Sequence, residues 1–273
     1  MTTIKTMEKN AQELRLTIIK MIYKAGSGHT GGSLSCAEIL TVLYDEIMNI
    51  RPKEPLWPDR DRFVLSKGHA APALYATLAR KGFFDPEHLN TLRQFGSILQ
   101  GHPCMFKLSG IEISTGSLGM GISIGIGMAL SAKAQGKSFR VFVLCGDGEL
   151  QEGQNWEALM SLTKWKLDNL VVIIDRNHVQ LDGTEEQVMP IGDLNAKLTA
   201  FGLHTLNCKG HDVKSLTDAF KTAVGYKGPV AIIAETVKGK GVSFMEGQSV
   251  WHGKPIGKVE YDQAVKEIEE GLK

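Results

Sequence analysis

Cysteine, net charge and long apolar runs are all scarce in this sequence, and each scarcity excludes a class of protein. The 273 residues include four cysteines, Cys36, Cys104, Cys145 and Cys208, and no two are spaced as CxxC. This spacing indicates neither a zinc site nor a disulfide framework, so a reducing cytoplasm suits the protein. The net charge is +1, from 31 Lys and Arg against 30 Asp and Glu. That balance gives no electrostatic reason to expect nucleic acid or an anionic membrane as a partner.

Long hydrophobic segments are also missing. The N-terminal MTTIKTMEKN is too polar for a signal peptide, and the longest apolar stretch, near 120–130, is short and interrupted by glycines. We therefore expect a soluble, cytoplasmic protein. With 42% hydrophobic residues, the chain can bury one sizeable core, and no repeat or low-complexity linker divides it. We expect a single domain over residues 1–273, ending in a polar helix from about residue 258.

Two kinds of segment alternate along the chain. Short, continuously apolar runs occur at 63–65, 141–145, 170–174, 204–208 and 230–234. Segments with helical spacing of apolar residues occur at 11–23, 37–48, 70–79, 122–134, 156–165 and 213–224. Strands that are apolar on both faces and separated by helices predict an α/β fold, with a mostly parallel central sheet covered by helices on both faces.

Glycines and polar residues follow each apolar run. The segments are Lys67-Gly68-His69, Gly146-Asp147-Gly148, Arg176-Asn177-His178, Gly210-His211-Asp212 and the KGKG at 238–241. In an open α/β sheet, ligands bind beyond the carboxyl ends of the strands. Glycines there let the backbone approach a ligand closely. We therefore expect the five strand ends to form one site.

Asp147 and Asn177 give the sharpest chemical prediction within that site. A carboxylate and an amide oxygen on neighbouring strand ends suit a hard cation such as Mg²⁺, and the backbone carbonyl of Val179 would add a third oxygen. Such a cation would be shared with a diphosphate, which also accepts hydrogen bonds from Gly148 N–H and the next helical turn. The structural alternative is a simple turn at the Asp-Gly pair.

Two better-known phosphate motifs fail in this sequence. The dinucleotide pattern GxGxxG needs a glycine at Gln151 after Gly146 and Gly148. Gly136-Lys137-Ser138 resembles the end of a P-loop, but its expected strand follows the motif instead of preceding it. The sequence therefore favours neither of these nucleotide sites.

Six motifs together resemble the transketolase family of thiamine diphosphate enzymes. GDGELQEG and the Asn in LVVIIDRNHVQLDG resemble the thiamine diphosphate fingerprint. SGHTGG (27–32), SKGHA (66–70), QGHP (100–103), TGSLGMG (115–121) and WHGKP (251–255) resemble transketolase motifs in the family's order. The resemblance covers nearly the whole chain.

The resemblance implies a role for each matching residue. Asp147, Asn177 and the Val179 carbonyl would bind Mg²⁺. The implied cofactor contacts are His69 and Gly148 at the diphosphate, Gly116 and Leu118 beside the rings, and Asn177 and His252 near the diphosphate. The implied catalytic group comprises His29, His69, His102 and His252, which would line the sugar funnel, and Glu152, which would couple paired sites at a subunit contact.

The chemistry of the reaction gives a second reason, besides the resemblance, to expect a catalytic role for these histidines. Transfer of a two-carbon ketol unit from a ketose to an aldose moves protons on hydroxyl and carbonyl oxygens near neutral pH, which suits imidazole. His211 and Asp212 have a simpler explanation, because Asp212 can cap the following helix. His178 belongs to no evident group of residues. For the KGKG loop, a solvated turn and a flap over the cofactor remain open.

One departure from the family bears on the partner. Family members continue into a pyrimidine-binding domain and a C-terminal domain, whereas this sequence ends at Lys273. The resemblance therefore implies the N-terminal subunit of a split transketolase, active only with a second chain of roughly 300 residues, two copies of each forming a heterotetramer. The sugar, or sugar phosphate, is open, with the pentose phosphate pathway as the default. Alternatives are a 2-oxoacid dehydrogenase component, a deoxyxylulose phosphate synthase-like subunit, or a non-catalytic nucleotide-binding module.

Overall fold

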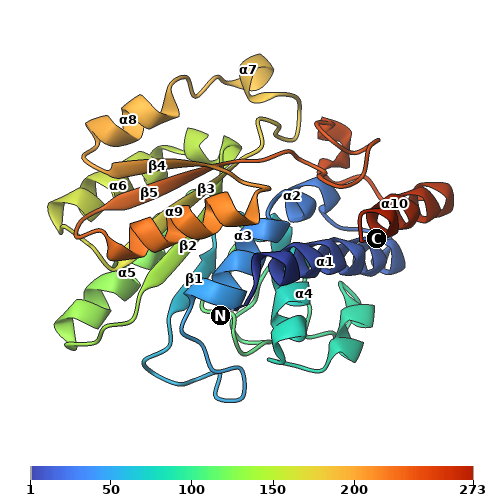
Figure 1. Ribbon diagram of the computed structural model, residues 1–273, viewed down its shortest axis with the longest axis horizontal. Coiled ribbons are helices and arrows are strands. Elements are labelled where there is room, and N and C mark those ends of the chain that lie inside the picture. Colours follow the sequence, from blue (N-terminus) through green and yellow to red (C-terminus); the bar gives the residue numbers. More distant parts are fainter. Residues whose placement is uncertain (1, 273) are drawn as a thin grey trace.

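One parallel sheet organises the molecule. The computed structural model describes residues 2–272. Five strands lie in the order β1-β2-β3-β5-β4, and every neighbouring pair is parallel (Figure 1). The strands are β1 (Arg62–Leu65), β2 (Val141–Gly146), β3 (Leu170–Arg176), β4 (His204–Lys209) and β5 (Val230–Glu235). All five apolar runs are strands, as expected from the sequence.

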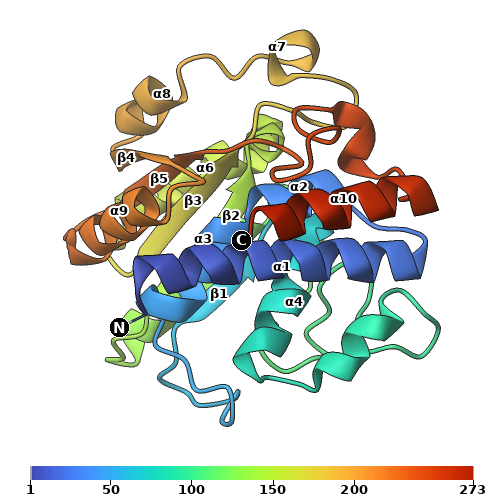
Figure 2. The same cartoon turned by 45° about the vertical axis from the view of Figure 1, so that its right-hand side comes forward.

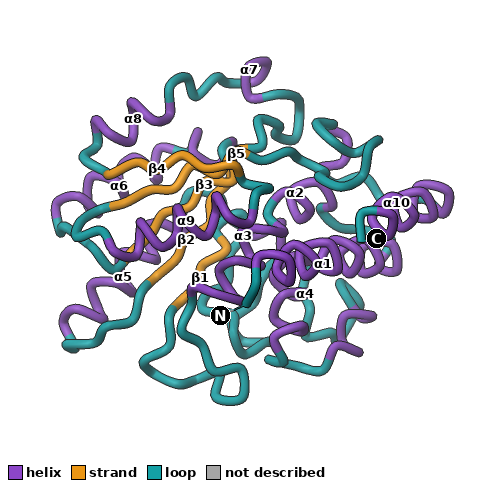
Figure 3. The backbone as a smooth tube through the Cα atoms, viewed as in Figure 1, coloured by secondary structure: helices purple, strands orange, loops and turns teal. Residues whose placement is uncertain are grey.

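Helices cover both faces of this sheet (Figure 3). The α-helices are α1 (Ile4–Ala25), α2 (Thr30–Ser35), α3 (Ala37–Val42), α4 (Ala71–Lys81), α5 (Gly121–Ala134), α6 (Gly153–Lys164), α7 (Glu185–Val188), α8 (Leu194–Ala200), α9 (Val213–Gly225) and α10 (Lys258–Glu270). A π-helical turn extends α3 over Leu43–Ile47, and 3₁₀ turns span Gly68–Ala70, Pro86–Thr91, Gly148–Gln151 and Ser249–His252. The predicted α/β fold is confirmed, including the polar helix from residue 258.

The strands divide their side chains between two apolar cores because successive residues point to opposite faces. In β3, Val171 and Ile173 pack toward α1, α3, α4, α9 and α10, whereas Val172 and Ile174 pack toward α5, α6 and α8. The long helices α1 and α10 lie side by side (Figure 2), and the rings of Tyr23 and Tyr261 stack between them. No helix in residues 2–272 is long and apolar enough to cross a membrane.

The strand order decides which strand ends can meet. Beyond β1, β2, β3 and β5, the chain bends into loops that carry His69, Asp147, Asn177 and Lys238. Strand β4 lies at the edge of the sheet, beside β5 alone. None of the residues that follow β4, Gly210, His211 and Asp212, lines the cavity described next, so the expectation that all five strand ends form one site is wrong for β4.

Candidate active site

A cavity of about 270 Å³ lies at the carboxyl ends of β1, β2, β3 and β5. Its wall contains most of the residues singled out from the sequence: His69, Leu118, Asp147, Gly148, Glu152, Asn177, Val179 and His252. His29, His102 and Gly116 lie next to it, because the His29 ring is 5.3 Å from the His252 ring and 5.9 Å from the His102 ring. A β-carbon built on Gly116 would lie 3.2 Å from the His102 ring. The structure thus brings distant motifs to one place.

Asp147 is a buried carboxylate held by the backbone. Its side chain is 4% exposed, and its oxygens accept hydrogen bonds from the N–H groups of Gly148 (2.8 Å) and His178 (2.5 Å). Burial, followed by the nearby Asp175 carboxylate, raises the pKa of Asp147 to about 6, against the lowering effect of those two N–H donors. A cation beside such a buried carboxyl group would strongly favour its ionised form.

Asn177 and Val179 complete an oxygen-rich wall. Asn177 is also buried, and its Oδ1 accepts a hydrogen bond from Val179 N–H at 3.1 Å. The Val179 carbonyl accepts a hydrogen bond from Lys238 Nζ at 2.9 Å. The predicted donors are a carboxylate, an amide oxygen and a backbone carbonyl on the same cavity, which is the donor chemistry that a hard divalent cation requires. The residues therefore fit such a cation.

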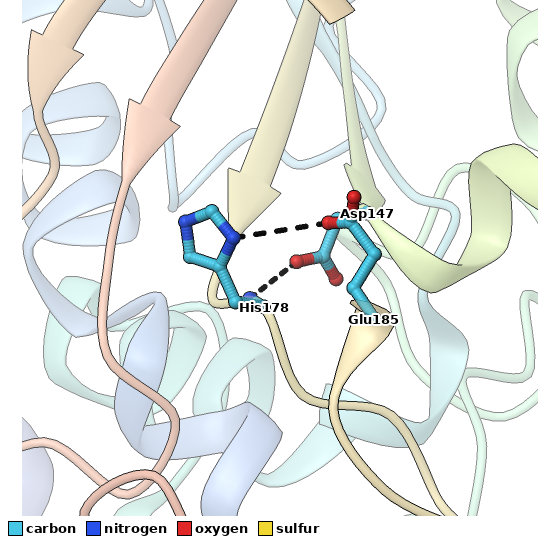
Figure 4. A group of neighbouring side chains, drawn as sticks. All are labelled: Asp147, His178 and Glu185. Atoms are coloured by element: carbon cyan, nitrogen blue, oxygen red, sulfur yellow. Dashed lines mark hydrogen bonds and ion pairs between the residues drawn. The ribbon is translucent and has the colours of Figure 1, made fainter. Parts of the chain in front are cut away.

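A second group of ligand-type side chains adjoins Asp147. Asp147, His178 and Glu185 point toward one another from the ends of β2 and β3 and the start of α7 (Figure 4). One ligand atom of each lies within 4.8 Å of the others. His178 has a positive φ of 61°, and its Nε2 lies 2.9 Å from Glu235 Oε2. The expectation that His178 stands alone is therefore wrong. Glu185 was missed because α7 is a four-residue helix without apolar periodicity.

The four predicted histidines form one cluster. His29 precedes α2, His69 and His252 lie in 3₁₀ turns, and His102 lies in a loop. The His29 ring lies 5.4 Å from the His69 ring, and the His69 and His252 rings are 4.9 Å apart. Imidazoles from four separate motifs thus surround one small volume. The arrangement can exchange protons with several oxygens of one bound substrate.

These imidazoles are held in the neutral form. Burial, and then the nearby charge of Arg93, lowers the pKa of His29 to about 4. Burial and the Lys238 ammonium lower the pKa of His252 to about 3. The pKa of His69 is also well below its usual value, through burial and Lys67. A neutral imidazole can both accept and donate a proton, so each is able to hydrogen-bond hydroxyl or carbonyl oxygens at neutral pH.

Two buried lysines belong to the site although the sequence analysis assigned them no role. Lys67 is 1% exposed, pairs with the buried Asp175 carboxylate and donates to the Gly32 carbonyl at 2.9 Å. Lys238, which is 2% exposed, lies 2.9 Å from His252 Nδ1 through its Nζ. Burial and the Lys67 charge lower the pKa of Lys238 to about 8. Lys238, the first residue of the KGKG segment, is therefore part of the cavity wall.

The glycines of the SGHTGG motif make room for these side chains. A β-carbon on Gly31 would lie 2.8 Å from Lys238 Cγ, and one on Gly32 would lie 3.2 Å from His69 Nε2. Gly31 also accepts a hydrogen bond at its carbonyl from Gly239 N–H at 3.0 Å. Helix α2 therefore approaches the cavity closely because it has no side chains at these two positions.

Glu149 links three of the motifs. It is 2% exposed and accepts hydrogen bonds from the Ser66 hydroxyl, Gly119 N–H (2.9 Å) and Gly146 N–H (3.1 Å). Burial raises the pKa of Glu149, although these donors oppose the shift. The carboxylate thereby joins SKGHA, TGSLGMG and GDGELQ. Glu152 is different, because its side chain is exposed at the start of α6.

Comparisons with known proteins agree with this geometry. Residues 6–270 match the family model described as "Transketolase, thiamine diphosphate binding domain". A relative from Phocaeicola vulgatus, named as a subunit of apulose-4-phosphate transketolase, is 45% identical over 272 residues, covering 98% of this chain and 96% of that protein. The 6-deoxy-6-sulfo-D-fructose transketolase subunit SqwG of a Clostridium species is 41% identical over 264 residues, covering 96% of each chain.

A solved structure gives the same answer. The crystal structure of transketolase from Campylobacter jejuni superposes with a TM-score of 0.92 at 35% identity, over 98% of this chain and 43% of that one. The chain thus spans less than half the length of that transketolase. Sequence, fold and the strand-end cavity all lead to one conclusion: the chain belongs to the transketolase family, whose thiamine diphosphate-binding domain it matches over residues 6–270.

Proposed function

We propose that this chain is the diphosphate-binding subunit of a two-chain transketolase. In this proposal, residues 1–273 form one domain, although Met1 and Lys273 lie outside the described residues. The observation that carries the proposal is the convergence of an all-oxygen donor set and four histidines on one cavity. Relatives that match this chain over nearly their whole length are themselves named as transketolase subunits, which supports a separate second chain.

The proposed cofactors are Mg²⁺ and thiamine diphosphate. Asp147, Asn177 and the Val179 carbonyl hold the metal ion, and Gly148 and His69 contact the diphosphate. Lys238 faces the same cavity and offsets the diphosphate charge. Each of these groups is buried or half-buried, so their electrostatic interactions are stronger than they would be in water.

The remaining residues act on the sugar. When bound, thiamine diphosphate supplies the nucleophilic carbon and the electron sink that cleavage of a ketose carbon–carbon bond requires. His29, His69, His102 and His252 hydrogen-bond the sugar hydroxyls and carbonyl and move protons there. Their low pKa values keep them neutral for this work. Gly116 and Leu118 lie beside the cofactor rings.

The second subunit completes the site. We propose that it supplies the pyrimidine-binding domain, and that two copies of each chain form a heterotetramer. The exposed Glu152 then lies at a subunit contact, where it couples paired sites. We also propose a cytoplasmic location, which suits the free thiols of all four cysteines.

The substrate is a ketose with an anionic terminal group. The names of the relatives give apulose 4-phosphate in one case and 6-deoxy-6-sulfo-D-fructose in another. These sugars share an anionic group at the end away from the ketol. A pentulose phosphate has the same feature, so a pentose phosphate role belongs in the same assay panel.

Cofactor binding provides the first test. Calorimetric titration of thiamine diphosphate into the chain with Mg²⁺ is expected to show binding, and Asp147→Ala is expected to abolish it without unfolding the sheet. Asp193→Ala is the matched control, because Asp193 is an exposed aspartate that caps α8 away from the cavity. Unaltered binding by Asp147→Ala contradicts the metal assignment, and preference for NAD or ATP contradicts the cofactor assignment.

Turnover provides the second test. With its partner subunit, the chain is expected to transfer a ketol unit from one of the three sugars to an aldose phosphate. Turnover of pyruvate in place of a ketose would instead assign the chain to a 2-oxoacid enzyme or a deoxyxylulose phosphate synthase.

A further inference from the structure

His211 connects the edge of the sheet to the active-site loop. It follows β4, outside the cavity, and its Nε2 accepts a hydrogen bond from Val237 N–H at 2.8 Å. Its Nδ1 lies 2.9 Å from Glu38 Oε2. Because Nε2 accepts, the proton of the neutral ring is on Nδ1 and is donated to Glu38. The neighbouring Asp212 accepts from Ser215 N–H at 2.9 Å and caps α9, as expected.

Glu38 anchors this ring firmly. It is 6% exposed, and its Oε2 also accepts a hydrogen bond from Arg15, a fully buried residue of α1, at 2.5 Å. Although burial raises the pKa of Glu38, Arg15 and His211 outweigh that effect and lower it. The charged Glu38 therefore fixes the orientation of His211 from α3.

The position of Val237 explains why the ring is needed. Thr236 N–H makes the last ladder hydrogen bond of β5, to the Arg176 carbonyl at 3.0 Å. The next N–H, that of Val237, points to the other side, where β4 has already ended at Lys209. The His211 ring accepts in place of a backbone carbonyl. Without it, a half-buried N–H would have no protein acceptor.

Val237 directly precedes Lys238, whose ammonium reaches the Val179 carbonyl and His252. The loop is packed closely on the same support, since a β-carbon on Gly241 would lie 2.9 Å from Arg15 Cδ. We propose that His211 is a positioning residue, which holds Val237 and thereby places Lys238 in the cofactor site. This inference rests on the proposed function, because it concerns the affinity of that site for thiamine diphosphate.

Two substitutions separate the two hydrogen bonds of the ring. The amide of His211→Asn reaches about as far as Nδ1, so it keeps the bond to Glu38 and loses the acceptor for Val237. The longer His211→Gln places its amide oxygen near the position of Nε2 and keeps that acceptor. We expect His211→Asn to weaken thiamine diphosphate binding at saturating Mg²⁺ by about three- to tenfold, as loss of one hydrogen bond predicts. His211→Gln is expected to bind within about twofold of the unaltered chain.

Two further readouts distinguish positioning from general stability. Amide hydrogen exchange of Val237 in the cofactor-free chain should accelerate in His211→Asn and not in His211→Gln. In a Lys238→Met background, His211→Asn should cause no further loss of affinity, because the residue through which it acts is gone. Equal affinity of His211→Asn and the unaltered chain, or an undiminished effect in the Lys238→Met background, overturns the proposal.

The same experiment keeps the two proposals apart. If the unaltered chain binds no thiamine diphosphate, the proposed function fails. In that case, an unchanged rate of amide hydrogen exchange at Val237 in His211→Asn also overturns the proposed role of His211. A faster rate supports the proposal that His211 holds Val237 in place.

Discussion

At the scale of single residues, the sequence predicted most of the polar residues of the cavity wall but not its two buried lysines. Asp147, Asn177 and His69 stood out because they follow apolar runs at the expected strand ends, whereas the roles of His29, His102 and His252 came from the family resemblance. Lys67 and Lys238 did not stand out, because a lysine beside glycines is typical of a solvated turn. Only the fold shows that both are buried under neighbouring elements. The one signal available was that Lys67 lies within SKGHA, one of the motifs that resemble the family.

The neutral state of His29 has a measurable consequence. Its pKa in the folded chain is lowered to about 4, and its ordinary value is 6.5. The unfolded chain therefore takes up this proton first as the pH falls, and the free energy of unfolding decreases from about pH 6.5 down to about pH 4. Urea unfolding of His29→Gln should show a smaller decrease over that range. The difference in the free energy of unfolding between the two proteins at pH 7.5 measures effects of the substitution that do not involve this proton. If the free energy of unfolding fell equally with pH in both proteins, the lowered pKa of His29 would be contradicted.

At the scale of elements, the apolar pattern located the buried strands and the long helices but missed three of the short ones. All five strands were predicted within two residues, since continuous apolar runs bounded by polar residues admit little ambiguity. Helices α2, α7 and α8 were missed. Helix α2 has the sequence TGGSLS, in which two glycines oppose helix formation, and it forms because it packs between the Lys238 loop and His69. Tertiary contacts, not local preference, determine it.

Helix α5 carries an apolar surface that the described residues cover only in part. Met120, just before the helix, is 44% exposed, Ile124 and Met128 are half-buried, and Gly127 is exposed with no atom within 4 Å of a built β-carbon. Such a surface favours a subunit contact. Gly127→Arg should leave the stability of the lone chain equal or higher, because arginine favours helices by up to about 1 kcal/mol over glycine.

We expect Gly127→Arg to act on assembly with the second subunit. In gel filtration or analytical ultracentrifugation with the second subunit, Gly127→Arg is expected to weaken assembly, because a long charged side chain enters a close helix contact. Lys133→Arg, a charge-preserving change near the end of α5, is the control. Assembly of Gly127→Arg as tight as that of the unaltered chain would remove α5 from the interface.

At the scale of the whole molecule, the fold class followed from the alternation of strands and helices, but the strand order did not. Placing β4 at the edge is a property of crossover connections that no short pattern encodes. His211, after β4, lies outside the cavity but accepts a hydrogen bond from Val237 N–H, next to Lys238.

In the proposed function, this chain holds the cofactor and needs a second chain to activate it. The most direct measurement is the rate of hydrogen–deuterium exchange at the C2 position of thiamine diphosphate, followed by NMR with Mg²⁺. We expect the isolated chain to bind the cofactor yet leave this rate near that of free thiamine diphosphate, and the addition of the second subunit to accelerate it. Fast C2 exchange on the isolated chain would contradict the account.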